Sequence, residues 1–107
     1  MEIKLRKPIE KDSKTIEKLT LDLKALTGSD LVLAEREARL RGDVSLDPLF
    51  SSEGLAIVAA RVSGLIPEDI LGLDAPDFVL VINTVRNFLF GWVLPAQMQS
   101  EIYEKQS

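Results

Sequence analysis

The sequence contains neither histidine nor cysteine. Without cysteine, the chain has no disulfide framework, no zinc–thiolate site and no thiol nucleophile. Without histidine, it lacks the commonest general base near neutral pH and the commonest ligand of transition metals. Aromatic residues are also scarce, at 6% of the 107 residues. This composition points away from catalysis and toward binding or scaffolding, with no cofactor.

Long hydrophobic runs and a basic overall charge are absent as well. No apolar run, Phe78 to Ile82 included, approaches the roughly 18 residues that a membrane-spanning helix needs. The first residues alternate charged and apolar side chains, which is not the pattern of a signal peptide. The net charge is −4, and nucleic-acid binding normally needs a cationic surface. We therefore expect a cytoplasmic protein that binds neither membrane nor nucleic acid.

The charges that are present are divided along the chain. Residues 1–24 carry seven basic and five acidic side chains, whereas residues 43–84 carry one arginine and seven acids. All six aromatic residues lie at Phe50 or later, so they are separated from most of the lysines. Surfaces that stack nucleic-acid bases interleave aromatic and basic residues, so this separation further disfavours nucleic acid as a partner.

Alternation of apolar and polar residues predicts two strands near the N-terminus. Ile3 and Leu5 alternate with charged residues, and three leucines alternate with polar residues over 19–23. The polar cluster at 10–14 predicts a connection longer than a two-residue turn. Ile16 is out of phase with the leucines, which indicates a bulge at the start of the second strand or a later start.

From Thr27 onward the apolar spacing becomes helical. Thr27 or Ser29 is the expected N-cap of a first helix that ends at Gly42, with Glu–Arg pairs four residues apart on its surface. A second helix is expected from a Ser52 cap to Gly64. A short third helix would begin at Pro67, and a fourth would follow Asp74 and Pro76.

The last helix has the strongest periodicity in the chain. Its core-facing stripe covers an arc of about 120° and consists of Phe78, Val81, Ile82, Val85, Phe88, Leu89 and Trp92. Val79, Leu80 and Phe90 lie on the other side, among Asn83, Arg86 and Asn87. Three apolar residues there are more than a solvated face requires, so Val79, Leu80 and Phe90 are candidate partner-binding residues.

Leu33 and Leu40 form a second candidate set on the first helix. They lie nearly opposite Leu31, Ala34 and Ala38, which share the expected core face. One interpretation packs this helix between two neighbouring elements. The other makes Leu33 and Leu40 part of an association surface.

These patterns predict a single small α+β domain over residues 1–94. Residues 1–24 form an N-terminal antiparallel β-hairpin, and residues 27–94 form a helical part of three to four α-helices. Residues 95–107 form a polar C-terminal tail.

No motif in the sequence organises chemistry. The glycines match neither the dinucleotide fingerprint nor the P-loop. A magnesium or calcium site built from Asp43, Asp47 and Glu53 fits no EF-hand spacing. An enzyme without histidine and cysteine would have no organised site here. A membrane-surface helix would need basic flanks, whereas the best amphipathic helix has acidic ones.

The order of several short segments resembles the small tail assembly chaperones of tailed bacteriophages and prophages, in their Mu-type branch. The resemblance covers about residues 3–90. The segments that carry it are Ile3-Lys4-Leu5-Arg6-Lys7-Pro8-Ile9, Leu26-Thr27-Gly28-Ser29-Asp30-Leu31, Gly64-Leu65-Ile66-Pro67-Glu68-Asp69 and Val85-Arg86-Asn87-Phe88-Leu89.

The resemblance implies a non-enzymatic assembly factor that acts in the cytoplasm of the bacterial host and is not part of the mature virion. Its implied partner is the tape-measure protein, which it would keep soluble while the tail tube forms, with the tail tube protein as a further candidate. A homo-oligomer is left open. The alternative function is a generic protein–protein adapter or oligomerisation domain. For either function, burial of the candidate apolar residues against the hairpin or a second subunit remains the competing interpretation.

Overall fold

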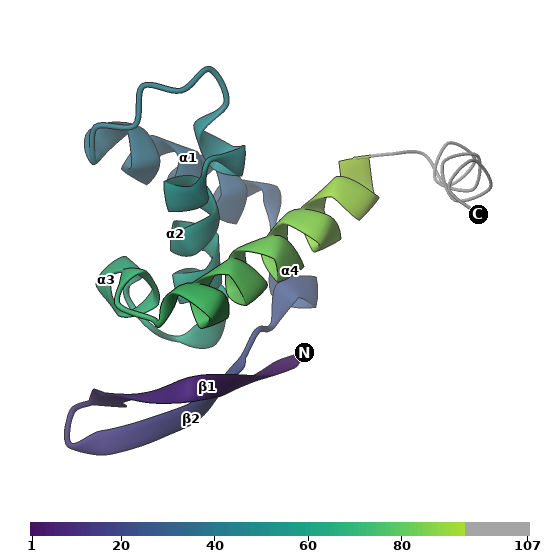
Figure 1. The fold of residues 1–107 in the computed structure, drawn as a ribbon. Coiled ribbons are helices and arrows are strands. Elements are labelled where there is room, and N and C mark those ends of the chain that lie inside the picture. Colours follow the sequence, from purple (N-terminus) through teal and green to yellow (C-terminus); the bar gives the residue numbers. More distant parts are fainter. Residues whose placement is uncertain (94–107) are drawn as a thin grey trace.

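The computed structural model describes the backbone of residues 1–93 and the side chains of residues 1–91. Its strands are β1 (Glu2–Lys11) and β2 (Lys14–Thr20), and its α-helices are α1 (Gly28–Leu40), α2 (Ser52–Ser63), α3 (Pro67–Leu71) and α4 (Ala75–Val93). Two 3₁₀ turns, η1 (Leu23–Ala25) and η2 (Pro48–Phe50), lie in the connections. The predicted α+β class, an antiparallel hairpin followed by helices, is confirmed (Figure 1).

The hairpin connection is tighter than the sequence pattern indicates. Lys11 pairs directly with Lys14, so only Asp12 and Ser13 form the turn. Both have positive φ angles, 52° and 65°. Two-residue turns with positive φ at both positions match the right-handed twist of paired strands, and aspartate tolerates that conformation better than most residues. The prediction of a longer connection is therefore wrong.

The irregularity of the hairpin lies in the first strand and not in the second. Lys4 pairs with Lys18, and Ile9 pairs with Ile16, so residues 5–8 of β1 lie opposite a single residue of β2. Pro8 belongs to this bulge, and it has no N–H to donate to a regular ladder. Strand β2 also ends at Thr20, earlier than predicted, although Leu21 and Leu23 are still buried.

The bulge is held by a buried carboxylate from α4. The backbone N–H groups of Arg6 and Lys7 donate to Oδ1 and Oδ2 of Asp77, each over 3.0 Å. Asp77 is only 1% exposed. The two N–H groups, Arg6 first, stabilise the charged form and lower the pKa of Asp77. Asp77 therefore joins the N-terminal end of α4 to β1.

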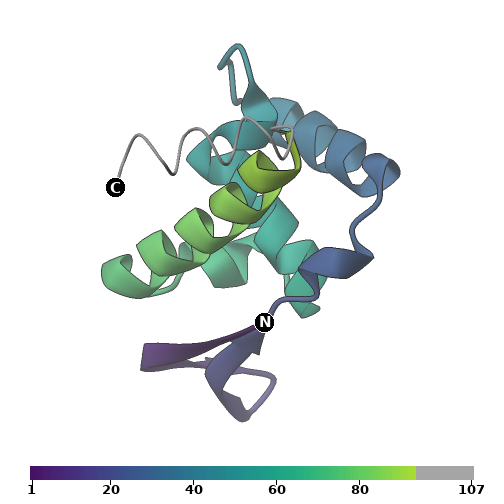
Figure 2. The ribbon, with the colours of Figure 1, turned by 90° about the vertical axis from the view of Figure 1, so that its right-hand side faces the viewer.

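Helix α2 is the centre of the helical part. Helices α1, α3 and α4 all pack against it (Figures 1 and 2), and every residue from Gly54 to Ala60 is buried. Its N-cap is Ser51 and not the predicted Ser52, because the Ser51 Oγ accepts from the Gly54 N–H over 3.0 Å. Gly64 ends the helix as predicted, with a left-handed φ of 74°.

The apolar stripe of α4 packs inward as the periodicity predicts. Val81, Ile82, Val85 and Leu89 are buried, and Phe78 and Phe88 pack against the same core. The side chain of Trp92 and the predicted polar tail at 95–107 lie outside the described residues. Ile3, Leu5 and Leu19 of the hairpin join this core, so hairpin and helices share one hydrophobic cluster.

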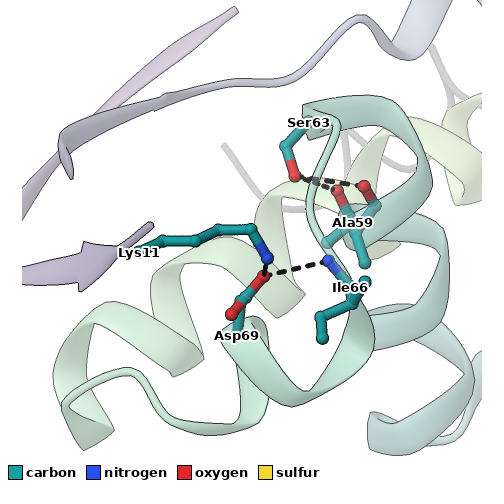
Figure 3. Close-up of polar contacts among 6 residues, drawn as sticks. Lys11, Ala59, Ser63, Ile66 and Asp69 are labelled. Atoms are coloured by element: carbon teal, nitrogen blue, oxygen red, sulfur yellow. Dashed lines mark hydrogen bonds and ion pairs between the residues drawn. The ribbon is translucent and has the colours of Figure 1, made fainter. Parts of the chain in front are cut away.

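A second polar contact ties the hairpin tip to α3. Lys11 Nζ lies 2.6 Å from Asp69 Oδ2, and the same oxygen accepts from the Ile66 N–H over 3.1 Å (Figure 3). The ammonium group of Lys11 is the main cause of the lowered pKa of Asp69. Together with Asp77, this contact places the helical part against one face and one end of the hairpin.

Candidate partner-binding surface

The outer face of α4 carries the first candidate set. Because α4 packs on α2 and β1 through its apolar stripe, the opposite side of the helix has no covering element among the described residues. Val79, Leu80 and Phe90 are 53%, 49% and 51% exposed, respectively. These three are therefore not buried against the hairpin, which excludes that half of the competing interpretation.

Polar residues lie between the apolar ends of this face. Asn83 and Asn87 are exposed, and Arg86 is half-buried. Arg86 Nη1 donates to Asn83 Oδ1 over 2.8 Å. On the same helix, the Thr84 hydroxyl donates to the Leu80 carbonyl over 2.7 Å, so it is satisfied within the helix. We refer to Val79, Leu80, Asn83, Arg86, Asn87 and Phe90 as the α4 face.

The second candidate set lies on α1, on the far side of α2 from α4 (Figure 1). Leu33 is 44% exposed and Leu40 is 81% exposed, whereas Ala34 and Ala38 are fully buried. Helix α1 packs against α2 and η2, but no element among the described residues covers Leu33 and Leu40, so the described part of the chain does not bury these two leucines between neighbouring elements. The structure does not bring the α1 and α4 sets into one surface.

The local order of α1 follows the sequence closely. Thr27 is its N-cap, and a capping box with Asp30 forms: each side chain accepts the other's backbone N–H. The Thr27 N–H first, and then the Arg61 guanidinium and the Thr27 hydroxyl, lower the pKa of Asp30. The two predicted pairs also form at 3.1 Å, between Arg39 and Glu35 and between Arg41 and Glu37.

Two further apolar residues are exposed that the sequence did not single out as candidate partner-binding residues. Val44 and Leu46 are 95% and 103% exposed in the loop between α1 and η2, which the sequence indicated only as an acidic linker. Asp43 organises this loop by accepting hydrogen bonds from the hydroxyls of Ser45 and Ser51. These hydroxyls, Ser45 first, lower the pKa of Asp43. The sequence feature that could have identified them is the presence of two apolar residues within a polar linker.

The carboxylates considered as a metal site have other roles. Asp43 is engaged with the two serine hydroxyls, while Asp47 precedes η2 and Glu53 lies in the first turn of α2. Within residues 1–91, no three carboxylates gather in a way that could hold a metal ion.

Two hollows on the described surface include charged residues in their lining. A hollow of about 700 Å³ on the hairpin is lined by Glu2, Lys4, Thr15, Ile16, Glu17 and Lys18. A smaller one, of about 290 Å³, includes Asp30 and Arg61, whose ion pair measures 3.1 Å. Neither hollow contains any of the five candidate residues.

None of the helices in the described part of the chain has the length and apolar character needed to cross a membrane.

Comparison with known proteins identifies the family. A search of curated proteins and a search of solved structures each found no match. A family model described as "Phage tail assembly chaperone proteins, E, or 41 or 14" matches residues 2–89. The match spans β1 through Leu89 of α4, and of the five candidate residues Phe90 alone lies outside it. The family is one of non-catalytic chaperones of tail assembly, and this chain belongs to it.

Proposed function

We propose that this protein binds the tape-measure protein and keeps it soluble until the tail tube assembles around it. The observation that carries the proposal is the α4 face: a helix whose inner side forms the domain core presents three large apolar residues outward. Family membership makes a tail protein the natural partner. The implied site of action is the cytoplasm of the bacterial host, and the chaperone would leave before the virion matures.

The physical mechanism is helix capture. A long helical client exposes apolar stripes before it is packaged, and such stripes drive aggregation. The α4 face offers apolar side chains in the i, i+1, i+11 positions of a rigid helix, so an amphipathic client helix packs beside it as helices do in groove recognition. Leu33 and Leu40 on α1 form a second contact set that would engage another segment of a long client.

The test is co-expression of this chain with the tape-measure protein of the same phage or prophage. We expect soluble co-purification with the wild-type chain. The double variant Leu80→Gln and Phe90→Gln removes two exposed side chains without touching the core, and glutamine keeps a good helix propensity. It should remain folded by circular dichroism and lose the soluble complex.

A matched control uses Leu46→Gln, which removes an even more exposed leucine from the loop. This variant should solubilise the client as the wild type does. An insoluble client with the wild-type chain would refute the proposal. A double variant that binds as well as the wild type would move the site away from α4.

Three finer points belong to the same proposal. The segment order suggests the Mu-type branch of the family, and the tail tube protein is a further candidate partner. A gene position between a tail-tube gene and a very long tape-measure gene would favour the tail assembly chaperone over a generic adapter. The alternative function is a generic adapter or oligomerisation domain. It would show self-association in sedimentation of the purified chain and no tail-protein complex in the co-expression test.

A further inference from the structure

Arg86 is distinguished from the other arginines of the described chain by its surroundings. Arg39, Arg41 and Arg61 each have a carboxylate oxygen within 3.0–3.1 Å. Arg6 and Arg36 are exposed to water. Arg86 is half-buried, and the acceptor that the structure gives its guanidinium is the neutral amide oxygen of Asn83, at 2.8 Å.

The Arg86 guanidinium has more hydrogen-bond donors than the single acceptor Asn83 Oδ1 can satisfy. It carries five N–H donors in a planar fork that matches a carboxylate. No carboxylate within residues 1–91 forms an ion pair with Arg86. The only acid of the described part of α4, Asp77, is buried and points to the β1 bulge. A partner that covers the α4 face with purely apolar residues would leave this charge desolvated and unpaired, at a high free-energy cost.

We propose that the α4 face selects client helices that carry an aspartate or glutamate opposite Arg86, between two apolar anchors. This inference rests on the proposed function and specifies its partner. The carboxylate forms a charge-assisted pair with the guanidinium, while the anchors contact Phe90 at one end and Val79 and Leu80 at the other. Covering the pair with apolar neighbours strengthens it, because the surrounding dielectric falls.

The spacing along α4 predicts the spacing in the client. At 1.5 Å per residue, Arg86 lies about 6 Å from Phe90 and about 10 Å from Val79 along the helix axis. A client helix packed nearly parallel or antiparallel would therefore place one anchor about four residues from its acid and the other about seven residues away on the opposite side. Asn83 and Asn87 lie on either side of Arg86 along the helix, so polar residues of the client next to its acid can hydrogen-bond there.

The experiment uses fluorescent overlapping peptides of the tape-measure protein and the full-length chain. Peptides that the wild type binds should contain the acid with its two anchors. Changing that acid to lysine should weaken binding to the wild type by at least about tenfold, the usual scale for a close interfacial charge pair. Arg86→Glu should weaken binding of the original peptide similarly and should restore binding of the lysine peptide, which a merely structural role would not do.

Lys14→Glu is the matched control, since it reverses an exposed charge at the hairpin turn. It should leave peptide affinity unchanged. Equal affinity of wild type and Arg86→Glu for the same peptides would overturn the inference. If that occurs while Leu80→Gln with Phe90→Gln abolishes binding, the proposed function stands without charge selection. If no tape-measure peptide binds the wild type, both proposals fail.

A second copy of this chain is the competing occupant of the α4 face. If Arg86→Glu dissociates a homo-oligomer of the purified protein and leaves peptide affinity unchanged, the face is a subunit interface and the inference is wrong.

Discussion

At the scale of single residues, Asp77 is the side chain whose role the sequence conceals most. Its position in the first turn of α4 is one where acids ordinarily stabilise the helix dipole. The structure instead directs both carboxylate oxygens at the backbone of β1, where the bulge leaves two N–H groups without strand partners. Buried donors of this kind require an acceptor, so Asp77 is needed for hairpin docking.

Replacing Asp77 with asparagine should destabilise the protein at neutral pH. An asparagine keeps the shape but has only one oxygen to accept, and its NH₂ group would face the second N–H. We expect a lower midpoint of denaturant unfolding, measured by circular dichroism. Asp47→Asn, at an exposed position with no side-chain cap bond, is the control and should unfold as the wild type does.

The same residue predicts a pH dependence. Because the folded-state pKa of Asp77 is lowered, its contribution is present above the ordinary value of 3.8 and is lost as the pH falls through the lower folded value. Wild-type stability should therefore fall on acidification below that range. Asp77→Asn should show a shallower fall, and parallel pH profiles for the two proteins would contradict this account.

At the scale of elements, the approach of η2 to the start of α2 depends on a glycine. A Cβ atom at Gly54 would lie 1.9 Å from the Pro48 carbonyl oxygen and 2.9 Å from that of Leu49. Both atoms belong to the backbone and have little freedom to move. The loop between α1 and α2 therefore packs closely only because position 54 has no side chain.

Gly54→Ala should cost about 1–3 kcal/mol or more of unfolding free energy through overpacking. Gly28→Ala in the first turn of α1 is the control, since a Cβ there meets nothing within 4 Å. That variant should stay within about 0.5 kcal/mol of the wild type. If Gly54→Ala left the free energy of unfolding unchanged, η2 would be free to move away from α2, which would contradict this prediction.

At the scale of the whole molecule, the hairpin and the helices share one hydrophobic core, so we expect them to unfold as one cooperative unit. Ile3, Leu5 and Leu19 belong to the same buried cluster as α2 and α4, and Asp69 and Asp77 add polar contacts between the two parts. An isolated two-stranded hairpin is marginal in water, so this one depends on the helical part for its stability. The helical part in turn loses core contacts without the hairpin.

Leu5→Ala tests this cooperativity. Leu5 is 4% exposed, and its truncation should cost about 2–5 kcal/mol. Because the fold is one unit, the loss should lower the unfolding midpoint of the helices as read by their circular dichroism. An unchanged helical transition would mean that the hairpin unfolds separately.

The sequence by itself determined the order and type of the elements, the inner stripe of α4, the capping of α1 and the family. These depend on local capping, on helical or strand periodicity and on short segments, all of which are written in neighbouring residues. The two-residue turn was hidden because Asp12 and Ser13 lack the glycine that usually marks positive φ.

Only the tertiary structure decided which apolar residues remain exposed and which charges remain unpaired. Leu33 and Leu40 could have been buried between two elements, but the contacts of α1 with α2 and η2 leave both leucines exposed. Asp77 looks like any helix-start acid until β1, some 70 residues earlier in the chain, brings two N–H groups to it. Exposure and pairing depend on contacts between distant segments, and no local pattern encodes them.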